Sequence, residues 1–500
     1  MQFSAIQLIF AAIMATDNNR FQAIISHCKE YGFIFPSSEI YDGLGAVYDY
    51  GQWGSELKKN IKDHWWKSMV QMHENIVGID AAIFMHPTTW KASGHVDNFS
   101  DPMIDNKDSN KRYRVDHLIE AKADELEKEG QQEQSEILLK EMDTLLAAND
   151  FDGLKTLIEN NKINCSVSNT CNWTDVRQFN LMFSTEFGAV SSEEEENKIY
   201  LRPETAQGIF VNFLNVQKTG RMKIPFGIAQ IGKAFRNEIV ARQFIFRMRE
   251  FEQMEMQFFI RPGTQKQWYE HWKAERMKWH LGLGIPAEKY RFHDHVKLAH
   301  YADAACDIEY DFPIGFKEVE GIHSRTDFDL KNHQEYSKKK LQYFDNDIDP
   351  ATGKPFGNYI PYVVETSIGV DRTVMMILSE AYEEQDLSTD EKKDSRVVLK
   401  FPARFAPIKL AILPLVKKDG LPEIARTIMD DCMGHFRCFY EEKDTIGKRY
   451  RRMDAIGTPF CVTVDHQSKE DNTVTIRYRD TMLQERIPID KIREIVLKAI

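Results

Sequence analysis

Apolar residues recur at helical spacing in two parts of the chain. Leu57, Ile61 and Trp65 are each four residues apart, which predicts an amphipathic helix with one apolar stripe. Between residues 116 and about 163 the chain is rich in Glu, Lys, Gln and Leu, and Leu138, Met142 and Leu145 keep helical spacing. Because aromatic residues are scarce there, we expect a helical insertion that projects from a larger domain. Its stretch 126–136 is either helical or a disordered, low-complexity segment.

Strand-like patterns fill most of the remaining chain. Residues 178–260 alternate apolar and polar positions, and a short strand at 360–365 turns into a helix after residue 369. Past residue 408, short apolar runs alternate with helical segments. We expect strands at 410–413, 436–440, 459–464 and 473–479, and helices at 421–433 and 445–456. That alternation predicts a small α/β domain of about a hundred residues.

Two strands of a predicted hairpin carry the most chemical information. The first contains Arg236, Asn237 and Glu238, and the second extends from Arg247 to Gln257. Because strand side chains alternate between faces, one face is expected to carry charged, aromatic and amide groups. These are Arg236, Glu238, Arg247, Arg249, Phe251, Gln253, Glu255 and Gln257. The opposite face, with Met248, Met254, Met256 and Phe258, is expected to be buried.

The polar face of this hairpin suits two ligands bound side by side. Guanidinium groups bind phosphates, an aromatic ring stacks on a flat base, and carboxylates accept hydrogen bonds from amino groups. A nucleoside triphosphate beside an amino acid would use all three. A solvated strand face with ion pairs is the plainer alternative, and a buried opposite face fits both.

Three motifs make the chain resemble the class II aminoacyl-tRNA synthetases. The hairpin, with its Arg-x-Glu followed by Arg-x-x-x-Phe-x-x-x-Glu, resembles motif 2. About 120 residues later, Gly369-Val370-Asp371-Arg372 resembles motif 3, although the usual Gly-x-Gly-x-Arg ending reads Gly-x-x-Arg here. Residues 43–54, ahead of the helix at 57–70, resemble the dimer-forming motif 1, with Gln52 where the family commonly has proline.

Five longer strings resemble one branch of that class, the glycyl-tRNA synthetases of the homodimeric type. They lie at residues 179–183, 201–208, 317–321, 325–330 and 446–460, and the resemblance covers roughly residues 27–500. It implies an α+β fold with an antiparallel catalytic sheet flanked by helices, a helical insertion and a C-terminal α/β anticodon-binding domain. It also implies a homodimer that activates glycine with ATP to glycyl-adenylate and transfers glycyl to the 3′ end of tRNA(Gly).

The resemblance also implies domain boundaries. An N-terminal extension is expected at 1–16, and the first part of the catalytic domain, with motif 1, at 17–115. The insertion is expected at 116–165, and the second part of the catalytic domain, with motifs 2 and 3, at 166–395. The anticodon-binding domain is expected at 404–500.

Individual residues receive roles through the same resemblance. ATP would be bound by Arg236, Asn237, Glu238, Arg247, Arg249, Phe251, Glu318, Val319, Gly369 and Arg372. Glycine would be bound by Arg114, Glu204, Glu255, Arg325, Glu365 and Ser367. Arg236 and Arg372 would be catalytic, because each sets a positive charge against the phosphates of reacting ATP. Contacts to tRNA would come from Arg242, Lys448, Arg449 and Arg452.

Metal is expected only together with ATP. Glu318 matches the carboxylate that holds Mg²⁺ bridging the ATP phosphates, and magnesium prefers such oxygen ligands. Some relatives carry paired Cys-x-x-Cys knuckles in the insertion, but this chain has Asn106 and Ser109 in the first region. The second region retains only Cys165 and Cys171, and two thiolates fall short of the four ligands of a structural zinc. We therefore expect no zinc.

Composition and charge limit the class of protein and the compartment in which it is expected. The formal net charge of −12 argues against a generally basic, nonspecific nucleic-acid binder, although a local basic patch lies near the C-terminus. Seven scattered cysteines, an odd number, favour a reducing compartment, so we expect a cytoplasmic protein. The apolar run from Ala5 to Ala15 is too short to span a bilayer. We expect a docked helix or a translation start placed too far upstream, and no membrane partner.

Two alternatives stay open. One keeps the enzyme class but makes alanine or serine the substrate. The other is a catalytically silent tRNA-binding paralogue of a class II synthetase, which the intact motif arginines and carboxylates disfavour.

Overall fold

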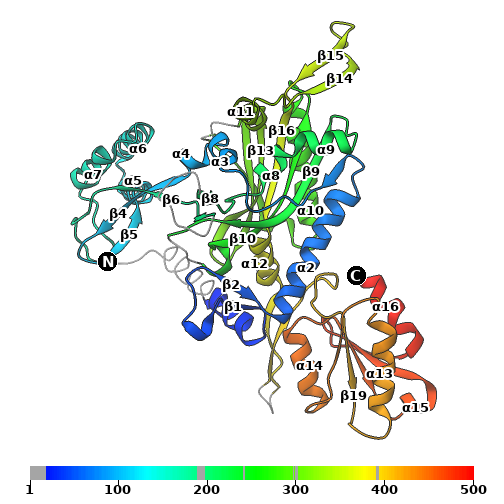
Figure 1. Cartoon of the computed structure of the whole chain (residues 1–500). Coiled ribbons are helices and arrows are strands. Elements are labelled where there is room, and N and C mark those ends of the chain that lie inside the picture. The colour runs from blue at the N-terminus through cyan, green and yellow to red at the C-terminus, as the bar shows by residue number, and fades with distance from the viewer. Residues whose placement is uncertain (1–18, 188–197, 240–242, 297, 299–301, 390–393) are drawn as a thin grey trace. The chain divides into compact units, whose positions relative to one another are not determined.

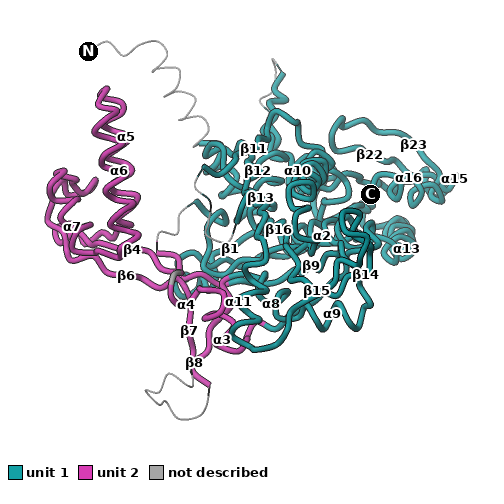
Figure 2. The backbone as a smooth tube through the Cα atoms, turned by 90° about the horizontal axis from the view of Figure 1, so that it is seen from above, with its two compact units in different colours: residues 1–82, 204–234, 242–500 teal, residues 83–203, 235–241 magenta. Residues whose placement is uncertain are grey.

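A computed structural model describes residues 19–187, 198–239, 243–296, 298, 302–389 and 394–500. The apolar run Ala5–Ala15 and Arg242 lie outside these residues. The chain divides into two compact units (Figure 2). The first unit comprises residues 1–82, 204–234 and 242–500, and the second comprises residues 83–203 and 235–241. Among the described helices, none combines the length and apolar composition needed to cross a membrane.

A seven-stranded sheet forms the centre of the first unit (Figure 1). Its order is β11 (Tyr290–Asp294), β12 (Ala304–Phe312), β13 (Gly315–Thr326), β16 (Tyr362–Gly369), β10 (Glu250–Ile260), β9 (Phe226–Phe235) and β3 (Ile76–Gly78). Pairing from β11 through β10 is antiparallel, whereas β3 runs parallel to β9. The antiparallel catalytic sheet expected from the sequence is therefore present.

Helices flank this sheet. They are α2 (Gln52–Trp66), α8 (Ala206–Val211), α9 (Phe213–Thr219), α10 (Gln265–Leu281), α11 (Phe328–Ser337) and α12 (Val370–Ala381). In α2 the predicted stripe of Leu57, Ile61 and Trp65 is fully buried, so that prediction is confirmed. Gly54 lies against the backbone of Phe33, and a Cβ there would come within 1.9 Å of the Phe33 carbonyl oxygen. Only glycine permits that approach of α2.

Short strand pairs complete this part of the first unit. They are β1 (Ile34–Pro36) with β2 (Tyr48–Tyr50), β14 (Tyr343–Ile348) with β15 (Pro355–Tyr359), and β17 (Tyr382–Asp386) with β18 (Ser395–Leu399), all antiparallel.

The C-terminal part of the first unit has its own five-stranded sheet. Its order is β20 (Cys438–Tyr440), β19 (Leu410–Pro414), β21 (Phe460–Val464), β22 (Thr473–Tyr478) and β23 (Gln484–Pro488). The helices here are α13 (Leu421–Cys432), α14 (Ile446–Ala455), α15 (Ser468–Asp471) and α16 (Ile492–Ala499). The predicted strands and helices of this α/β domain are confirmed to within two residues at each end. Parallel pairing of β19 with both neighbours accounts for the crossover helices between them.

The second unit contains the helical segment predicted from composition. Its helices are α3 (Pro87–Ala92), α4 (His95–Asn98), α5 (Val115–Lys128), α6 (Gln132–Ala147) and α7 (Phe151–Asn160). Its strands are β4 (Ser100–Asn106), β5 (Lys111–Arg114), β6 (Arg177–Asn180), β7 (Ser184–Glu186) and β8 (Lys198–Tyr200). The stretch 126–136 is helical apart from a turn at 129–131, so the disordered alternative is wrong. Leu138 and Met142 are buried and give α6 an apolar face.

A buried ion cluster fixes α14 in the C-terminal part. Asp454 is fully buried and accepts two hydrogen bonds from Arg477, at 2.8 and 3.0 Å, and one from Arg396, at 2.9 Å. These arginines come from β22 and β18 respectively. A single carboxylate therefore joins a helix to two different sheets.

We predict that Asp454→Ala destabilises this region by about 3–5 kcal/mol, because two buried guanidinium groups lose their counter-charge. Amide hydrogen exchange measured over residues 446–479 should accelerate accordingly. Asp480→Ala removes a carboxylate whose side chain is 58% exposed and serves as the control. Equal exchange rates in the two variants would contradict the role given to Asp454.

Candidate active site

Two buried acids face each other across the central sheet. Glu255 on β10 is paired in register with Ser367 on β16, and Gln257 with Glu365, which brings these side chains onto one face. The Gln257 Nε2 donates to Glu255 Oε1 at 2.7 Å and to Glu365 Oε2 at 2.6 Å. Glu255 and Glu365 are only 2% and 4% exposed. One amide group thus bridges two buried carboxyls.

The Glu365 carboxylate is held ionised by basic neighbours. Arg325 Nη1 donates to Glu365 Oε2 at 3.1 Å, and His323 Nδ1 lies 2.8 Å from Glu365 Oε1. Burial opposes ionisation, but Arg325 and His323 outweigh it and hold the pKa of Glu365 far below its usual value. Arg325 also binds Asp329 with two hydrogen bonds, at 2.8 and 3.1 Å, so it is shared between two acids.

Glu255 has the opposite character. Burial raises the pKa of Glu255 well above its usual value, and the negative charges of Glu365 and Glu204 raise it further. Thr205 Oγ1 donates to Glu255 Oε2. Gln207 Nε2 completes the ring of polar groups by donating at 3.0 Å to Glu204 Oε1 and to Asp329 Oδ1. The neighbouring acids therefore differ in proton affinity: the pKa of Glu365 is lowered, whereas that of Glu255 is raised.

The charges of this pocket suit an amine. The acids Glu204, Glu255, Glu365 and Asp329 gather around Arg325 and His323. Burial opposes protonation of His323, but Glu365 outweighs it and raises the pKa of that imidazole. A primary ammonium ion donates three hydrogen bonds and carries the positive charge that this set lacks. Ser367 lies at the same place, with its Oγ 3.4 Å from Gln253 Nε2. Five predicted glycine-binding residues are thus brought together: Glu204, Glu255, Arg325, Glu365 and Ser367.

Arg372 and Glu318, predicted to act on ATP, contact each other. Arg372 lies in the first turn of α12, and its Nη1 is 2.9 Å from Glu318 Oε2. Its guanidinium also lies 4.5 Å from the centre of the Phe246 ring. Gly369 caps the N-terminus of α12. Val319, by contrast, is buried in the core with 1% exposure, so its side chain cannot meet ATP and only its backbone is available.

The ends of the predicted hairpin differ from the prediction. β9 ends at Phe235 and β10 begins at Glu250, so Arg236, Asn237, Glu238, Arg247 and Arg249 lie outside the strands and do not alternate as strand residues do. The backbone bonds elsewhere instead: Asn237 N donates to Leu181 O at 2.8 Å, and Arg249 N to Ala46 O at 2.9 Å.

Within β10 the predicted alternation is confirmed. Met254, Met256 and Phe258 are buried, whereas Phe251 and Gln253 are partly exposed. Met248, which precedes the strand, is buried as well.

Two predicted site arginines belong to the second unit. Arg236 Nε donates to the Pro203 carbonyl at 3.0 Å, and its guanidinium lies 5.5 Å from the Phe99 ring. Arg114 pairs with Asp116 at 2.5 Å and with Asp101 at 3.1 Å. Both are therefore held by neighbours within that unit.

Sequence reasoning missed a buried cluster beside Arg372. Asp371 Oδ1 accepts hydrogen bonds from Tyr50 OH at 2.5 Å and from Lys58 Nζ at 2.8 Å, and its Oδ2 accepts from the backbone N of Glu252 at 2.8 Å. Lys58 Nζ also lies 3.1 Å from Glu252 Oε2, and Lys62 binds the same carboxylate. Asp371 is 3% exposed. The cluster joins α2 to the start of the helix that carries Arg372.

The predicted tRNA contacts on α14 need one correction. Arg449 is 1% exposed, and its guanidinium donates to the carbonyls of Pro414, Glu441 and Leu415. It holds the fold together and does not face a ligand. Lys448 is exposed, and Arg452 is paired with Asp444 at 2.7 Å.

The positions considered for zinc hold a hydrogen-bonded cluster. The Asn106 side-chain oxygen accepts from Ser109 N at 3.0 Å and from Ser168 Oγ at 2.9 Å. Cys165 Sγ lies 3.2 Å from Ser109 Oγ and from Tyr113 OH. In the described part of the chain, no group of three or more His, Cys, Asp or Glu residues is arranged to hold a metal ion.

Comparison with known proteins identifies the class. Residues 183–381 match the class II tRNA synthetase core domain (G, H, P, S and T), and residues 409–499 match an anticodon-binding domain. The crystal structure of the RNA-binding domain of threonyl-tRNA synthetase from Cryptosporidium parvum superposes with a TM-score of 0.60 at 15% identity, covering 95% of this chain and 97% of that one. This likeness shows the fold, and the chain is a class II aminoacyl-tRNA synthetase.

More similar relatives define the family. Residues 101–137 and 129–181 match the glycyl-tRNA synthetase insertion domain 1. The glycine–tRNA ligase of Chlorobaculum tepidum is 52% identical over 473 residues, which cover 94% of this chain and 98% of the relative. That of Treponema denticola is 50% identical over 472 residues, covering 93% and 94%. The chain belongs to the glycine–tRNA ligases.

We predict that Lys58→Met impairs the ATP-dependent step by roughly 10- to 100-fold in kcat/KM for ATP, because Asp371 no longer fixes the helix turn that aims Arg372. The KM for glycine should change much less, whereas a purely structural defect would impair the use of both substrates. Lys59→Met is the matched control, because Lys59 is 64% exposed and pairs only with exposed Asp63. Lys58→Arg keeps the positive charge and should retain activity. Equal losses of kcat/KM for ATP and for glycine in Lys58→Met, or an inactive Lys58→Arg variant, would contradict this positioning role.

Proposed function

We propose that this glycine–tRNA ligase recognises glycine by its ammonium group in the pocket of Glu204, Glu255 and Glu365. The observation that carries the proposal is the excess of buried carboxyls over cations around Arg325. Glycine has no side chain to grip, so its affinity has to come from its charged ends. Alanine would be excluded by collision of its methyl group with packed atoms, because excluding a larger substrate is easier than excluding a smaller one.

Glycine activation requires contact between two negative groups. The substrate carboxylate attacks the α-phosphate of ATP, releasing pyrophosphate and forming glycyl-adenylate. Arg236 would neutralise the charge that develops there, and Arg372 the phosphates that leave. Phe251 would stack on adenine, Glu238 would accept from its amino group, and Arg247 would hold the far phosphates. Catalysis would then rest on positioning and charge stabilisation. The glycyl group passes next to the terminal adenosine of tRNA.

The residues near Glu318 fit a magnesium ion bound with ATP. The Glu318 side chain is 48% exposed, which leaves a carboxylate oxygen accessible to a hard cation. Burial and the charge of Glu318 raise the pKa of nearby Asp307, and a cation would relieve that repulsion. Magnesium supplies neutralisation of the phosphate charge. Glu318 would hold it, and Arg372, its present partner, would turn to the phosphates.

Partners follow from the same family. We propose a homodimer through α2 and the motif 1 segment that leads into it, residues 43–54, and tRNA contacts from Lys448, Arg452 and Arg242. We also propose that no structural zinc is bound, because Asn106 and Ser109 offer no thiolate and already hydrogen-bond within their cluster. We also propose that the enzyme is cytoplasmic, because its seven cysteines are free, as is usual in a reducing compartment.

The first test concerns Arg236. Arg236→Ala should lower glycine-dependent ATP–pyrophosphate exchange by at least about 100-fold, because one preorganised charge at the reacting phosphate is lost. Lys233→Ala, which removes an exposed lysine from neighbouring β9, should retain exchange. Near-normal exchange in Arg236→Ala would refute the catalytic assignment.

The second test concerns the amino-acid pocket. Ser367→Ala should raise the KM for glycine roughly 10-fold while leaving the KM for ATP almost unchanged, because a polar contact to the amino acid is lost. The same exchange assay with alanine and serine should show no activity in the unaltered enzyme. A KM increase shared equally by ATP and glycine would mean that Ser367 does not belong to the glycine pocket.

A further inference from the structure

Two cysteines of the C-terminal domain lie at the two ends of one turn. Cys432 is the last residue of α13, and Cys438 is the first residue of β20. The Cys432 carbonyl closes the turn by accepting hydrogen bonds from His435 N at 3.0 Å and from Phe436 N at 3.3 Å. The chain thus folds back over a few residues, and both cysteines belong to the apolar core of this domain.

The thiols of these two cysteines contact each other. Cys432 and Cys438 are joined by a side-chain hydrogen bond, and the Cys438 Sγ also lies 3.6 Å from the Phe436 carbonyl oxygen. The contact between the thiols lowers the pKa of Cys432 and raises that of Cys438, which burial raises further. One sulfur is therefore favoured as a thiolate and the other as a thiol. A thiolate is the form in which a cysteine reacts.

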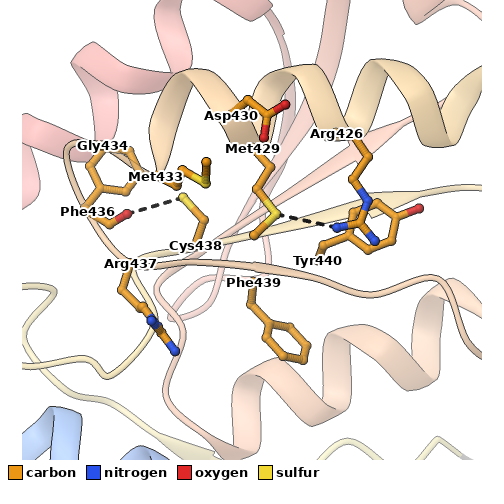
Figure 3. A pocket seen from close by; sticks show the side chains of 10 residues that line it. All are labelled: Arg426, Met429, Asp430, Met433, Gly434, Phe436, Arg437, Cys438, Phe439 and Tyr440. Atoms are coloured by element: carbon orange, nitrogen blue, oxygen red, sulfur yellow. Dashed lines mark hydrogen bonds between the residues drawn. The ribbon is translucent and has the colours of Figure 1, made fainter.

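A groove beside α13 and β20 gives small molecules access to the pair. It has a volume of about 750 Å³, and Cys438 is one of the residues that line it. Cys438 and Tyr440 point toward α13, and the sulfur atoms of Met429 and Met433 lie on the same side of β20 (Figure 3). Cys438 is 7% exposed, whereas Cys432 is 1% exposed. A reagent of the size of hydrogen peroxide can reach the pair through the groove, and a bulky one cannot.

We propose that Cys432 and Cys438 are a redox modification site, a dithiol that hydrogen peroxide converts to an intramolecular disulfide. One thiolate attacks a peroxide oxygen, the O–O bond breaks, and the sulfur becomes a sulfenic acid. The hydroxide that leaves takes up the proton of that first thiol. The second thiol then attacks the sulfenic sulfur, so that an S–S bond forms and water leaves. The two thiols are oxidised, and the peroxide is reduced to two molecules of water.

The disulfide would tie the end of α13 covalently to the start of β20. An S–S bond is about 2.05 Å long, which is shorter than any contact between unbonded sulfur atoms. Disulfides in reducing compartments are mostly transient and sense oxidants, so the dithiol is the resting form. This inference goes beyond the proposed function and does not depend on it, because neither tRNA nor glycine takes part in the reaction.

Peptide mapping of the full-length enzyme tests the site directly. The reduced enzyme is treated with hydrogen peroxide, its remaining thiols are blocked with N-ethylmaleimide in denaturant, and the protein is digested with trypsin. Trypsin cleaves after Arg437 and so separates the two cysteines. Mass spectrometry should find peptides 427–437 and 438–443 joined by a disulfide that dithiothreitol breaks. Recovery of both peptides with blocked thiols would overturn the proposal.

Cys461 in the same sheet is the matched control. It is 1% exposed, burial raises its pKa to about 12, and the groups that act on its charge are Asp454, Arg477 and Arg479 rather than a thiol. The linked peptides should form at least about 10-fold faster than the Cys461 thiol is lost, because a protonated thiol reacts slowly with peroxide. Equal rates would mean that both sites react only in unfolded protein, and would overturn the proposal.

The variants Cys432→Ser and Cys438→Ser each remove one partner. Neither should yield linked peptides, and dimedone should trap the remaining cysteine of the pair as its sulfenic acid. Met433 competes for the oxidant, because its side chain is 58% exposed at the same groove. Conversion of Met433 to its sulfoxide while both thiols stay reduced in the unaltered enzyme would overturn the proposal.

Amide hydrogen exchange of the unaltered enzyme gives a second measurement that does not depend on the variants folding. Exchange over residues 427–440 should be slower in the peroxide-treated enzyme than in the reduced enzyme, because the new bond restrains the turn. Dithiothreitol should restore the faster exchange. The same exchange in both forms would contradict a covalent link between α13 and β20.

Discussion

The catalytic part of the protein depends on how it accommodates buried negative charge. Burying a carboxylate is costly unless it is paired or protonated, and here several acids lie within one shell around Arg325. Arg325 is shared by Glu365 and Asp329, while Gln257 and Gln207 each bridge two acids. Burial and the charges of Glu365 and Glu204 raise the pKa of Glu255, which favours its neutral form. The strands β10, β13 and β16 and the helices α8 and α11 all contribute to this one shell, so their packing and the pocket are the same structure.

A second cluster connects this site to motif 1. Asp371 stands next to Arg372 and is bound by Tyr50 and Lys58. Because Lys58 lies on α2, the proposed dimer helix, a change in the position of α2 would reach the helix turn that carries Arg372. Adjacent residues thus have separate tasks: Arg372 faces Glu318 and the phosphates, and Asp371 fixes the backbone from which Arg372 extends.

The sequence predicted what local periodicity determines. The buried stripe of α2 and the elements of the C-terminal domain follow from the spacing of apolar residues, and Glu255 and Gln257 were placed on one face because both lie well inside β10. The prediction failed at the ends of the hairpin. There the backbone of Asn237 bonds to Leu181 and that of Arg249 to Ala46, in place of hydrogen bonds between paired strands. Such long-range bonds leave no local pattern.

Arg449 shows a different kind of failure. It lies four residues before buried Met453, so helical spacing places both on the inner face of α14. Its charge suggested exposure, but three backbone carbonyls satisfy its guanidinium inside the domain. Gln207 and His323 were missed for a related reason: their contacts to Glu204 and Glu365 depend on strand register and on the packing of α8, which sequence spacing does not fix.

The central claim is that an ammonium ion takes the place of the missing positive charge in the pocket. Isothermal titration calorimetry of glycine binding at neutral pH, repeated in buffers of different ionisation enthalpy, tests it directly. On this account the raised pKa of Glu255 lets the empty pocket hold a proton, which an arriving ammonium ion should expel. The account predicts release of about one proton per glycine bound, abolished by Glu255→Gln. Binding without proton release, or equal release in Glu255→Gln, would contradict it.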